Sequence, residues 1–149
     1  MTQPDPPLPL WALVQTAHLA ARRFTEVFAA AGLTPAQFGV LACLADGDDL
    51  SKAELAQAIL VRPQSMARLT NAMVDQGLLR RTGPGGRGRR SGLVMTDRGR
   101  QALEQARPAA WAINQPDAVG LSAEEIDILL DHLQTISRTL TDRPSEVDP

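Results

Sequence analysis

The stretch Ser51–Leu69, SKAELAQAILVRPQSMARL, decides the fold of this chain. Ser51 fits a helix N-cap, and Glu54 stands three residues later, which is the spacing of a capping box. Pro63 fits the first position of a second helix, where its missing N–H costs nothing. Only a short turn at residues 60–62 separates the two helices. Two helices joined by so tight a turn predict a helix-turn-helix unit.

The second helix of this unit, predicted over residues 63–76 and ended by Gly77, has two different faces. With side chains projected at about 100° per residue, the apolar ones gather on one side. They are Met66, Leu69 and Met73. The opposite side carries the polar groups, which are Gln64, Ser65, Arg68, Asn71 and Asp75. One face can therefore pack on a core while the other meets a partner.

In a DNA-binding helix-turn-helix, the second helix lies in the major groove and presents its N-terminal residues to base edges. Gln64 suits adenine, Arg68 suits guanine, and Ser65 suits a base or a phosphate. Asn71 and Lys52 are placed to reach the sugar-phosphate backbone. These five residues are the predicted contacts of the helical unit with a duplex.

A β-hairpin is predicted directly after this unit. The segments 78–82 and 91–96 are short, contain apolar residues and lack helix periodicity. Between them, Gly83–Arg90 reads GPGGRGRR and can only be a loop. It lacks the Lys-Ser/Thr ending of a phosphate-binding loop, and no helix follows it directly. We expect a flexible basic tip that enters the neighbouring minor groove or neutralises phosphates. Its arginines are Arg87, Arg89 and Arg90.

Four further helices are predicted around these elements. Apolar positions spaced alternately by three and four residues indicate one long amphipathic helix near the N-terminus. Thr34, Thr96 and Ser122 fit the N-caps of three later helices. Pro108 is expected to kink or end the helix after Thr96, because a proline removes a helical hydrogen bond. The predicted helices cover residues 10–31, 35–46, 52–59, 63–76, 97 onward and 123–140.

Charge is distributed unevenly along the chain. The formal net charge of the 149 residues is −2, which by itself argues against a nucleic-acid partner. Residues 62–100, however, hold nine arginines and two aspartates and carry +7, whereas the rest of the chain carries −9. The planar guanidinium group suits phosphate and guanine, so this clustering favours a polyanionic partner.

The inventory of reactive side chains is small. The chain has one cysteine, Cys43, and two histidines, His18 and His132, without a close-spaced pair of metal ligands. Cys43 stands in an apolar run, which indicates a core residue rather than a redox sensor. No nucleophile and base are arranged as in an enzyme, and no cofactor is expected. Without a basic-flanked signal peptide or a bilayer-spanning apolar stretch, a cytoplasmic protein is expected.

Five short motifs stand out when the chain is taken as a whole. They are Leu33–Leu41, Leu50–Ala56, Val61–Leu69, Gly77–Arg81 and Met95–Gly99. In this order and spacing they resemble the MarR family of winged helix-turn-helix transcription regulators, over about residues 10–140. The resemblance implies a mainly α fold with a small β-hairpin wing, in which a winged helix-turn-helix lobe joins N- and C-terminal dimerisation helices. It also implies a homodimer that represses genes near a pseudo-palindromic operator.

This resemblance divides the chain into three parts. The implied parts are a flexible N-terminal segment at 1–9, a single MarR-like domain at 10–140 and a flexible C-terminal tail at 141–149. Within the domain, the winged lobe covers 33–100 and the dimerisation helices cover 10–31 and 101–140. The apolar stripes of the terminal helices suit both dimer contacts and an ordinary monomer core.

Two positions depart from the pattern of the family. Arg62 stands where the family usually has a small polar N-cap before the second helix. In the wing, Gly88 and Arg89 stand where the family often has an Asp-Arg pair, whose carboxylate directs the arginine. Arg89 is the best match to the family's minor-groove arginine, but it lacks that acidic partner.

Members of this family commonly respond to small aromatic or lipophilic anions, bound between the dimer helices and the lobe. Trp11, His18 and Arg22 share one face of the first helix at spacings of seven and four residues. Phe38 is expected opposite them, so these four residues are the predicted lining of an effector pocket. The alternative is that Trp11 and His18 serve packing alone.

Two classes of function are weighed at this stage. The first is a sequence-specific, ligand-responsive DNA-binding repressor, and the second is a winged-helix module that binds protein or RNA without operator specificity. Stacking on single-stranded bases is disfavoured, because the five aromatic residues all stand in apolar contexts.

Overall fold

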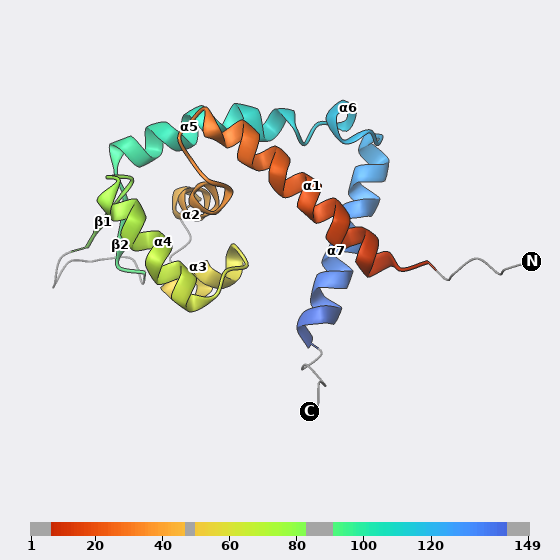
Figure 1. Ribbon diagram of the computed structural model, residues 1–149, viewed down its shortest axis with the longest axis horizontal. Coiled ribbons are helices and arrows are strands. Elements are labelled where there is room, and N and C mark those ends of the chain that lie inside the picture. The colour runs from red at the N-terminus through yellow and green to blue at the C-terminus, as the bar shows by residue number, and fades with distance from the viewer. Residues whose placement is uncertain (1–6, 47–49, 83–90, 143–149) are drawn as a thin grey trace, which may run out of the picture. The chain divides into compact units, whose positions relative to one another are not determined.

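The computed structural model describes residues 7–46, 50–82 and 91–142 (Figure 1). The chain divides into two compact units, residues 1–110 and 111–149. The described residues are mainly helical with one antiparallel two-stranded hairpin, which confirms the predicted fold class. The elements are α1 (Pro9–Ala29), α2 (Pro35–Ala45), α3 (Lys52–Ala58), α4 (Pro63–Asp75), β1 (Leu79–Arg81), β2 (Leu93–Met95), α5 (Asp97–Ala112), α6 (Pro116–Val119) and α7 (Ala123–Asp142).

Local capping starts the helices where the sequence predicts. The Thr34 hydroxyl accepts from the Gln37 N–H at 3.2 Å, and the Gln37 side chain accepts from the Thr34 N–H at 2.9 Å. Ser51 and Glu54 form the same reciprocal pair at 3.2 and 2.7 Å. The Thr96 hydroxyl caps α5 by accepting from the backbone N–H three residues later at 3.0 Å. These bonds satisfy N–H groups that have no partner within their own helix.

The turn between α3 and α4 has a left-handed residue at Leu60, with φ +56°. The Leu60 N–H bonds to the Gln57 carbonyl at 3.2 Å, and the Val61 N–H bonds to the Ala56 carbonyl at 2.9 Å. This pattern is a Schellman motif, in which glycine normally takes the left-handed position. The ends of α1 and α4 use Gly32 (φ +67°) and Gly77 (φ +73°) in this way, with the corresponding backbone bonds.

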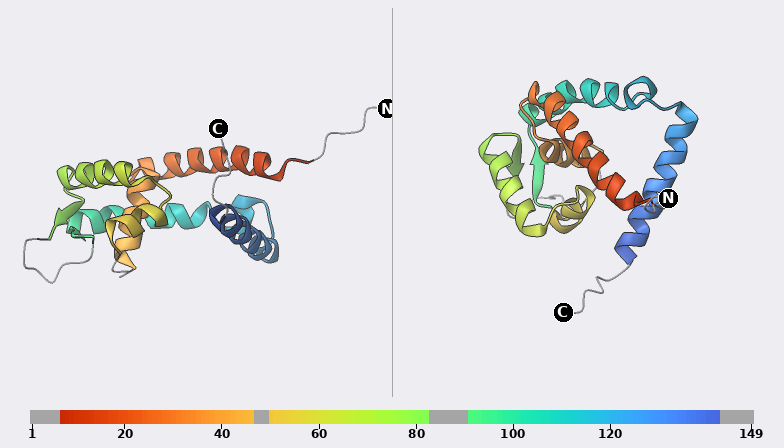
Figure 2. Two further views of the ribbon diagram at one scale, coloured as in Figure 1. Left: turned by 90° about the horizontal axis from the view of Figure 1, so that it is seen from below. Right: turned by 45° about the vertical axis from the view of Figure 1, so that its right-hand side comes forward.

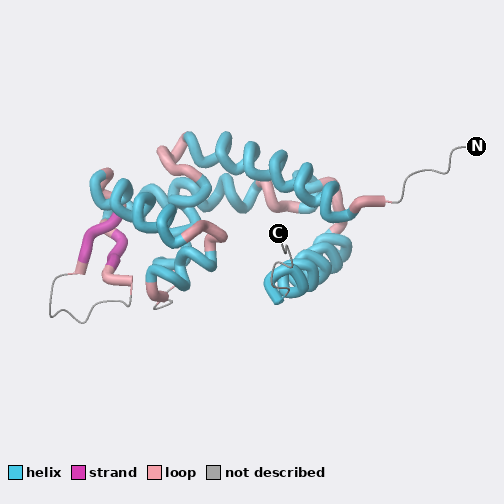
Figure 3. Tube along the Cα trace, turned by 60° about the horizontal axis from the view of Figure 1, so that its bottom comes forward, coloured by secondary structure: helices cyan, strands magenta, loops and turns pink. Residues whose placement is uncertain are grey.

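The core of the first unit lies where α2, α3, α4, α5 and the hairpin meet. β1 contacts α4, and the two strands lie at one edge of the lobe (Figure 3). Strand pairing is antiparallel, with Leu79 opposite Met95 and Arg81 opposite Leu93. The largest fully buried side chains are Phe28, Leu41, Leu55, Met66, Met73, Leu79, Leu93 and Leu103. Burial of these side chains holds α4 and the hairpin in fixed relation to each other.

Helix α1 joins this core only near its C-terminal end. Phe28 is its one buried residue, and its ring stacks on Phe38 of α2 with centroids 4.3 Å apart. The N-terminal part of α1 extends away from α2 and α3 (Figure 2). Trp11 is 59% exposed there, and Leu19 is 64% exposed.

The second unit contains α6 and α7. A capping box starts α7: the Ser122 N–H donates to Glu125 at 2.8 Å, and the Glu125 N–H donates to the Ser122 hydroxyl at 3.2 Å. None of the residues of α7 is buried. Its apolar stripe includes Leu129 and Leu130, which are 38% and 50% exposed.

Several element boundaries differ from the sequence-based expectations. Helix α5 continues for four residues past Pro108, so this proline does not end it. A proline near a helix end removes a single hydrogen bond, and the turn that follows is short. Helix α1 begins at Pro9, and α7 runs two residues into the segment expected to be a tail. The strands are shorter than predicted, and the four-residue helix α6 was not predicted.

Candidate nucleic-acid interface

The polar face of α4 is the centre of the candidate site. Gln64, Ser65, Arg68 and Asn71 are all exposed. On the other side of α4, Met66, Thr70 and Met73 are buried in the core. Because that inner face is fixed by packing, the outer face points in a defined direction. The expected division of this helix between apolar and polar faces is confirmed.

The start of α4 lacks a side-chain cap. Arg62 is the N-cap residue and has an extended backbone, but its side chain makes no capping bond. Pro63 occupies the first helical position. The first N–H groups of the helix, except that of the proline, are therefore open to an outside acceptor. Lys52, at the first position of α3, is exposed as well.

One side-chain hydrogen bond connects α4 to the hairpin. Nη2 of Arg81, the last residue of β1, donates to Oδ1 of Asn71 at 2.5 Å. Both residues are exposed. Sequence reasoning missed Arg81, because the bond spans ten residues and depends on the hairpin folding back beside α4. The only signal in the sequence was the position of Arg81 at the end of a predicted strand.

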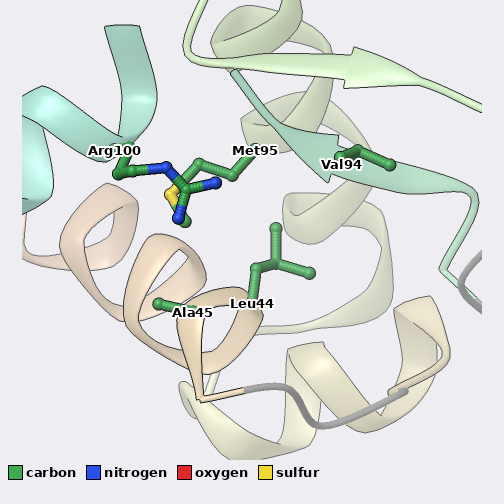
Figure 4. Close-up of a pocket in the computed structure, with 5 residues that line it drawn as sticks. All are labelled: Leu44, Ala45, Val94, Met95 and Arg100. Atoms are coloured by element: carbon green, nitrogen blue, oxygen red, sulfur yellow. The ribbon is translucent and has the colours of Figure 1, made fainter. Parts of the chain in front are cut away.

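Not all of the clustered arginines belong to this face. Arg100 of α5 lies with Leu44, Ala45, Val94 and Met95 around a small cleft (Figure 4). Its guanidinium group lies over Met95, near the C-terminal end of α2. A positive charge is favourable at a helix C-terminus, so we interpret Arg100 as stabilising the lobe. The predicted wing arginines Arg87, Arg89 and Arg90 lie outside the described residues.

The predicted effector residues are only partly brought together. His18 and Arg22 line a shallow depression on α1, together with Ala21, Thr25 and Glu26. His18 Nδ1 lies 2.7 Å from the Val14 carbonyl oxygen. Trp11 and Phe38 do not line this depression: Trp11 lies further along α1, and Phe38 packs against the core.

The remaining reactive groups have structural surroundings. Cys43 is half-buried and packs against the hydrophobic core. Within residues 7–46, 50–82 and 91–142, no group of three or more His, Cys, Asp or Glu side chains could hold a metal ion. None of the helices in that same part of the chain is long and apolar enough to cross a membrane.

Comparison with known proteins identifies the family. A model of the MarR family matches residues 31–90, which contain α2, the helix-turn-helix unit and β1. A protein assigned to transcriptional regulation of the hcr operon in Thauera aromatica is 33% identical over 117 residues, covering 78% of this chain and 70% of that protein. The chain belongs to the MarR family. It is a transcriptional regulator, and its relatives indicate no enzyme family.

Solved structures of other MarR-type regulators have the same fold. The transcriptional repressor CouR bound to p-coumaroyl-CoA superposes with a TM-score of 0.75 at 28% identity, covering 88% of this chain and 92% of that one. CouR bound to a 23-mer DNA duplex superposes with a TM-score of 0.74 at 30% identity, covering 87% of this chain and 92% of that one. A third structure is that of the MarR-family protein Rv2887 of Mycobacterium tuberculosis in complex with salicylic acid. It superposes with a TM-score of 0.67 at 26% identity, covering 89% of this chain and 98% of that one.

Proposed function

We propose that this MarR-family regulator is a homodimeric repressor that binds a pseudo-palindromic DNA operator and releases it on binding a small ligand. The polar face of α4 carries the proposal. Three of its side chains, Gln64, Ser65 and Arg68, are exposed and make no hydrogen bond or ion pair within the described residues. They stand on a helix whose other face is fixed in the core, which is the arrangement of a recognition helix. The DNA complex of CouR supports this assignment.

Each polar residue has a proposed partner on the duplex. Gln64 pairs with adenine and Arg68 with guanine, while Ser65 contacts a base or phosphate. Lys52 and Asn71 contact the backbone. The wing arginines Arg87, Arg89 and Arg90 supply minor-groove or phosphate contacts beside them. The domain assignment follows, with 33–100 as the DNA-binding lobe.

The dimer is proposed from the surface that a single chain leaves uncovered. The terminal helices at 10–31 and 101–140 expose apolar side chains, including Leu19 at 64% and Leu140 at 54%. Large apolar side chains exposed on each of these helices favour an interaction surface. Two copies related by a two-fold axis would cover these residues, and would present two copies of α4 about one helical turn of DNA apart, roughly 34 Å.

The proposed effector is a small aromatic or lipophilic anion. Arg22 offers a cation and His18 a ring beside the apolar surface of α1, which suits an aromatic acid. CouR with p-coumaroyl-CoA and Rv2887 with salicylic acid support this class of ligand. Trp11 and Phe38 do not line this depression, so the proposed contacts of the effector are those of Arg22 and His18. Salicylic acid and p-coumaroyl-CoA are therefore the first probes. Arg22→Ala should raise the ligand concentration needed to release the protein from DNA at least tenfold, which corresponds to about 1.4 kcal/mol or more.

Selection of duplex DNA from a random pool tests the proposal most directly. We expect winners with two-fold symmetry, bound by a dimer. Arg68→Ala should then lose discrimination at one base position in each half-site, by about 1–3 kcal/mol. Arg23→Ala is the matched control, because Arg23 is exposed but lies on α1, 3.3 Å from Glu26. Equal binding of random and selected duplexes would instead favour the protein- or RNA-binding module.

A further inference from the structure

The contact between Arg81 and Asn71 determines how the Asn71 amide is turned. The two side chains meet at 2.5 Å through Nη2 and Oδ1. A guanidinium group can only donate hydrogen bonds, so the amide oxygen has to face it. The amide NH₂ of Asn71 then points elsewhere, and it too can only donate. The groups that the pair leaves open are therefore mainly donors, namely the amide NH₂ and the remaining guanidinium N–H groups, beside one lone pair of the amide oxygen.

This pair extends the polar face of α4 toward the hairpin. Gln64, Arg68 and Asn71 follow one another at spacings of four and three residues, so they form one stripe along the helix. Arg81 is bonded to the last member of that stripe. It also shares a strand face with the buried Leu79, two residues before it, so its backbone is anchored in the core. The stripe thereby gains a cation from another element.

The partner of Arg81 holds the guanidinium group without neutralising it. An amide carries no net charge, whereas a carboxylate in its place would cancel the charge of the arginine. Elsewhere on the surface Arg23 has such a carboxylate, Glu26, at 3.3 Å. Among the described residues no ion pair involves Arg81. Fixing a long side chain before binding reduces the entropy that binding has to remove.

We propose that Arg81 binds a phosphate of the DNA backbone beside the groove that α4 enters, and that Asn71 is the residue that positions it. A phosphate oxygen is an acceptor, which suits these donors, and phosphates and sugars take half or more of the hydrogen bonds between proteins and DNA. Base edges offer acceptors alone only at some positions, such as guanine in the major groove. The contact therefore adds affinity for every duplex and no sequence preference. This inference rests on the proposed DNA-binding function, and it adds a residue that the sequence did not indicate.

The test measures the salt dependence of binding to a mixed-sequence duplex of about 30 base pairs, roughly three helical turns. Replacing Arg81 with glutamine should reduce the slope of log affinity against log salt by about 0.9, the value for one phosphate contact. Arg81→Lys should largely preserve the slope, because it preserves the charge. Arg80→Gln is the matched control, because Arg80 is the exposed neighbour on the same strand and its side chain leaves the opposite face. An equal reduction for Arg80→Gln would overturn the assignment to Arg81.

The positioning role of Asn71 is tested in a double-mutant cycle. Asn71→Ala should weaken binding about threefold or more in the wild-type background. Its effect should be clearly smaller when Arg81→Gln is already present, because only the backbone contact of Asn71 itself is then left to lose. Additive effects would overturn the positioning role. If Asn71 and Arg81 only brace the fold, Arg81→Gln lowers the thermal midpoint and leaves the salt slope unchanged, which would also overturn the proposal.

The wild-type protein separates this inference from the function on which it rests. If wild type binds the duplex with a steep salt dependence and Arg81→Gln binds with the same slope, only the role of Arg81 is wrong. If wild type shows no salt-sensitive affinity for DNA, the proposed function and this inference fail together.

Discussion

Apolar side chains are buried in the winged lobe at 33–100, whereas similar side chains on the C-terminal helix α7 are exposed. In the lobe, Leu41, Leu55 and Leu93 are completely buried. In α7 no residue is buried, although the helix is as clearly amphipathic by its sequence. The difference teaches that periodicity predicts a face, while only the tertiary structure shows whether the same chain covers it. The lobe has a core of its own, whereas the apolar stripe of α7 is available to a partner.

The largest expected effect is at Gly99, where the lobe has no spare room. A Cβ atom at this position would overlap the Leu78 carbonyl oxygen and would lie 3.0 Å from the Met95 side chain. Backbone of the hairpin would have to move away from α5. We expect Gly99→Ala to destabilise the protein by about 3 kcal/mol or more, despite the better helix propensity of alanine. Urea unfolding measures the change.

The control for this variant is Gly32→Ala. Gly32 has φ +67°, but a Cβ atom added there would meet no other atom within 4 Å. Only the left-handed backbone then opposes the substitution, at about 1–2 kcal/mol. If Gly99→Ala and Gly32→Ala lowered the free energy of unfolding equally, close packing at the hairpin would contribute little to the stability of the lobe.

A smaller effect is expected on α7, and it concerns association. Leu130→Glu places a carboxylate in the apolar stripe, and we expect the dimer to weaken by about 2 kcal/mol, roughly thirtyfold in dissociation constant. Thr135→Glu places the same group on the other side of the helix and should leave association unchanged. Sedimentation equilibrium at micromolar concentrations distinguishes the two. If the wild type were monomeric, no second copy would cover the apolar stripe of α7, and the proposed contrast with the self-covered core of the lobe would be wrong.

The third prediction tests the turn between α3 and α4. Leu60 is 91% exposed and has φ +56°, so it has little packing to lose and an unfavourable backbone to relieve. Leu60→Gly should therefore stabilise the lobe by about 1 kcal/mol, as glycine does at the equivalent turns after α1 and α4. Differential scanning calorimetry should show a midpoint a few degrees higher. A lower midpoint would indicate that the exposed leucine makes a stabilising contact in the native assembly.

The smallest effect is expected from the cap of α7 in acid. Hydrogen bonds from the Ser122 backbone N–H and then its side chain hold the pKa of Glu125 below its ordinary value. Because the folded-state pKa is lowered, this stabilisation is present above the unfolded-state pKa and is lost as pH falls through the folded one. Glu125→Gln should therefore lower the urea midpoint slightly at neutral pH, and this difference from the wild type should vanish in acid below the folded-state pKa.

Glu124→Gln is the control for this cap, because no hydrogen bond joins Glu124 to Ser122 in the described chain. Glu124→Gln should leave the difference between the urea midpoints at neutral and at acid pH the same as in the wild type. If Glu124→Gln lowered the urea midpoint by as much as Glu125→Gln, and with the same pH dependence, the cause would be the negative charge of the first turn of α7 and not the hydrogen bond to Ser122.

Features coded by neighbouring residues were predictable. The capping boxes at Thr34, Ser51 and Ser122 involve residues three apart, so the sequence displays both partners. Features that need the folded chain were not. Arg81 meets Asn71 only because β1 folds back beside α4, and Arg100 turns to the end of α2 although it belongs to the same basic segment.

The sequence by itself determined the two faces of α4, the helix starts and the family of this protein, because short-range hydrogen bonds and helical periodicity depend on nearby residues. The tertiary structure decided how the basic residues are used. It placed Arg81 beside the polar face of α4 and Arg100 in the lobe. It also decided that the lobe covers its own apolar surface while α7 does not. The physical reason is that burial and side-chain pairing depend on which elements pack together, and packing joins residues far apart in the chain.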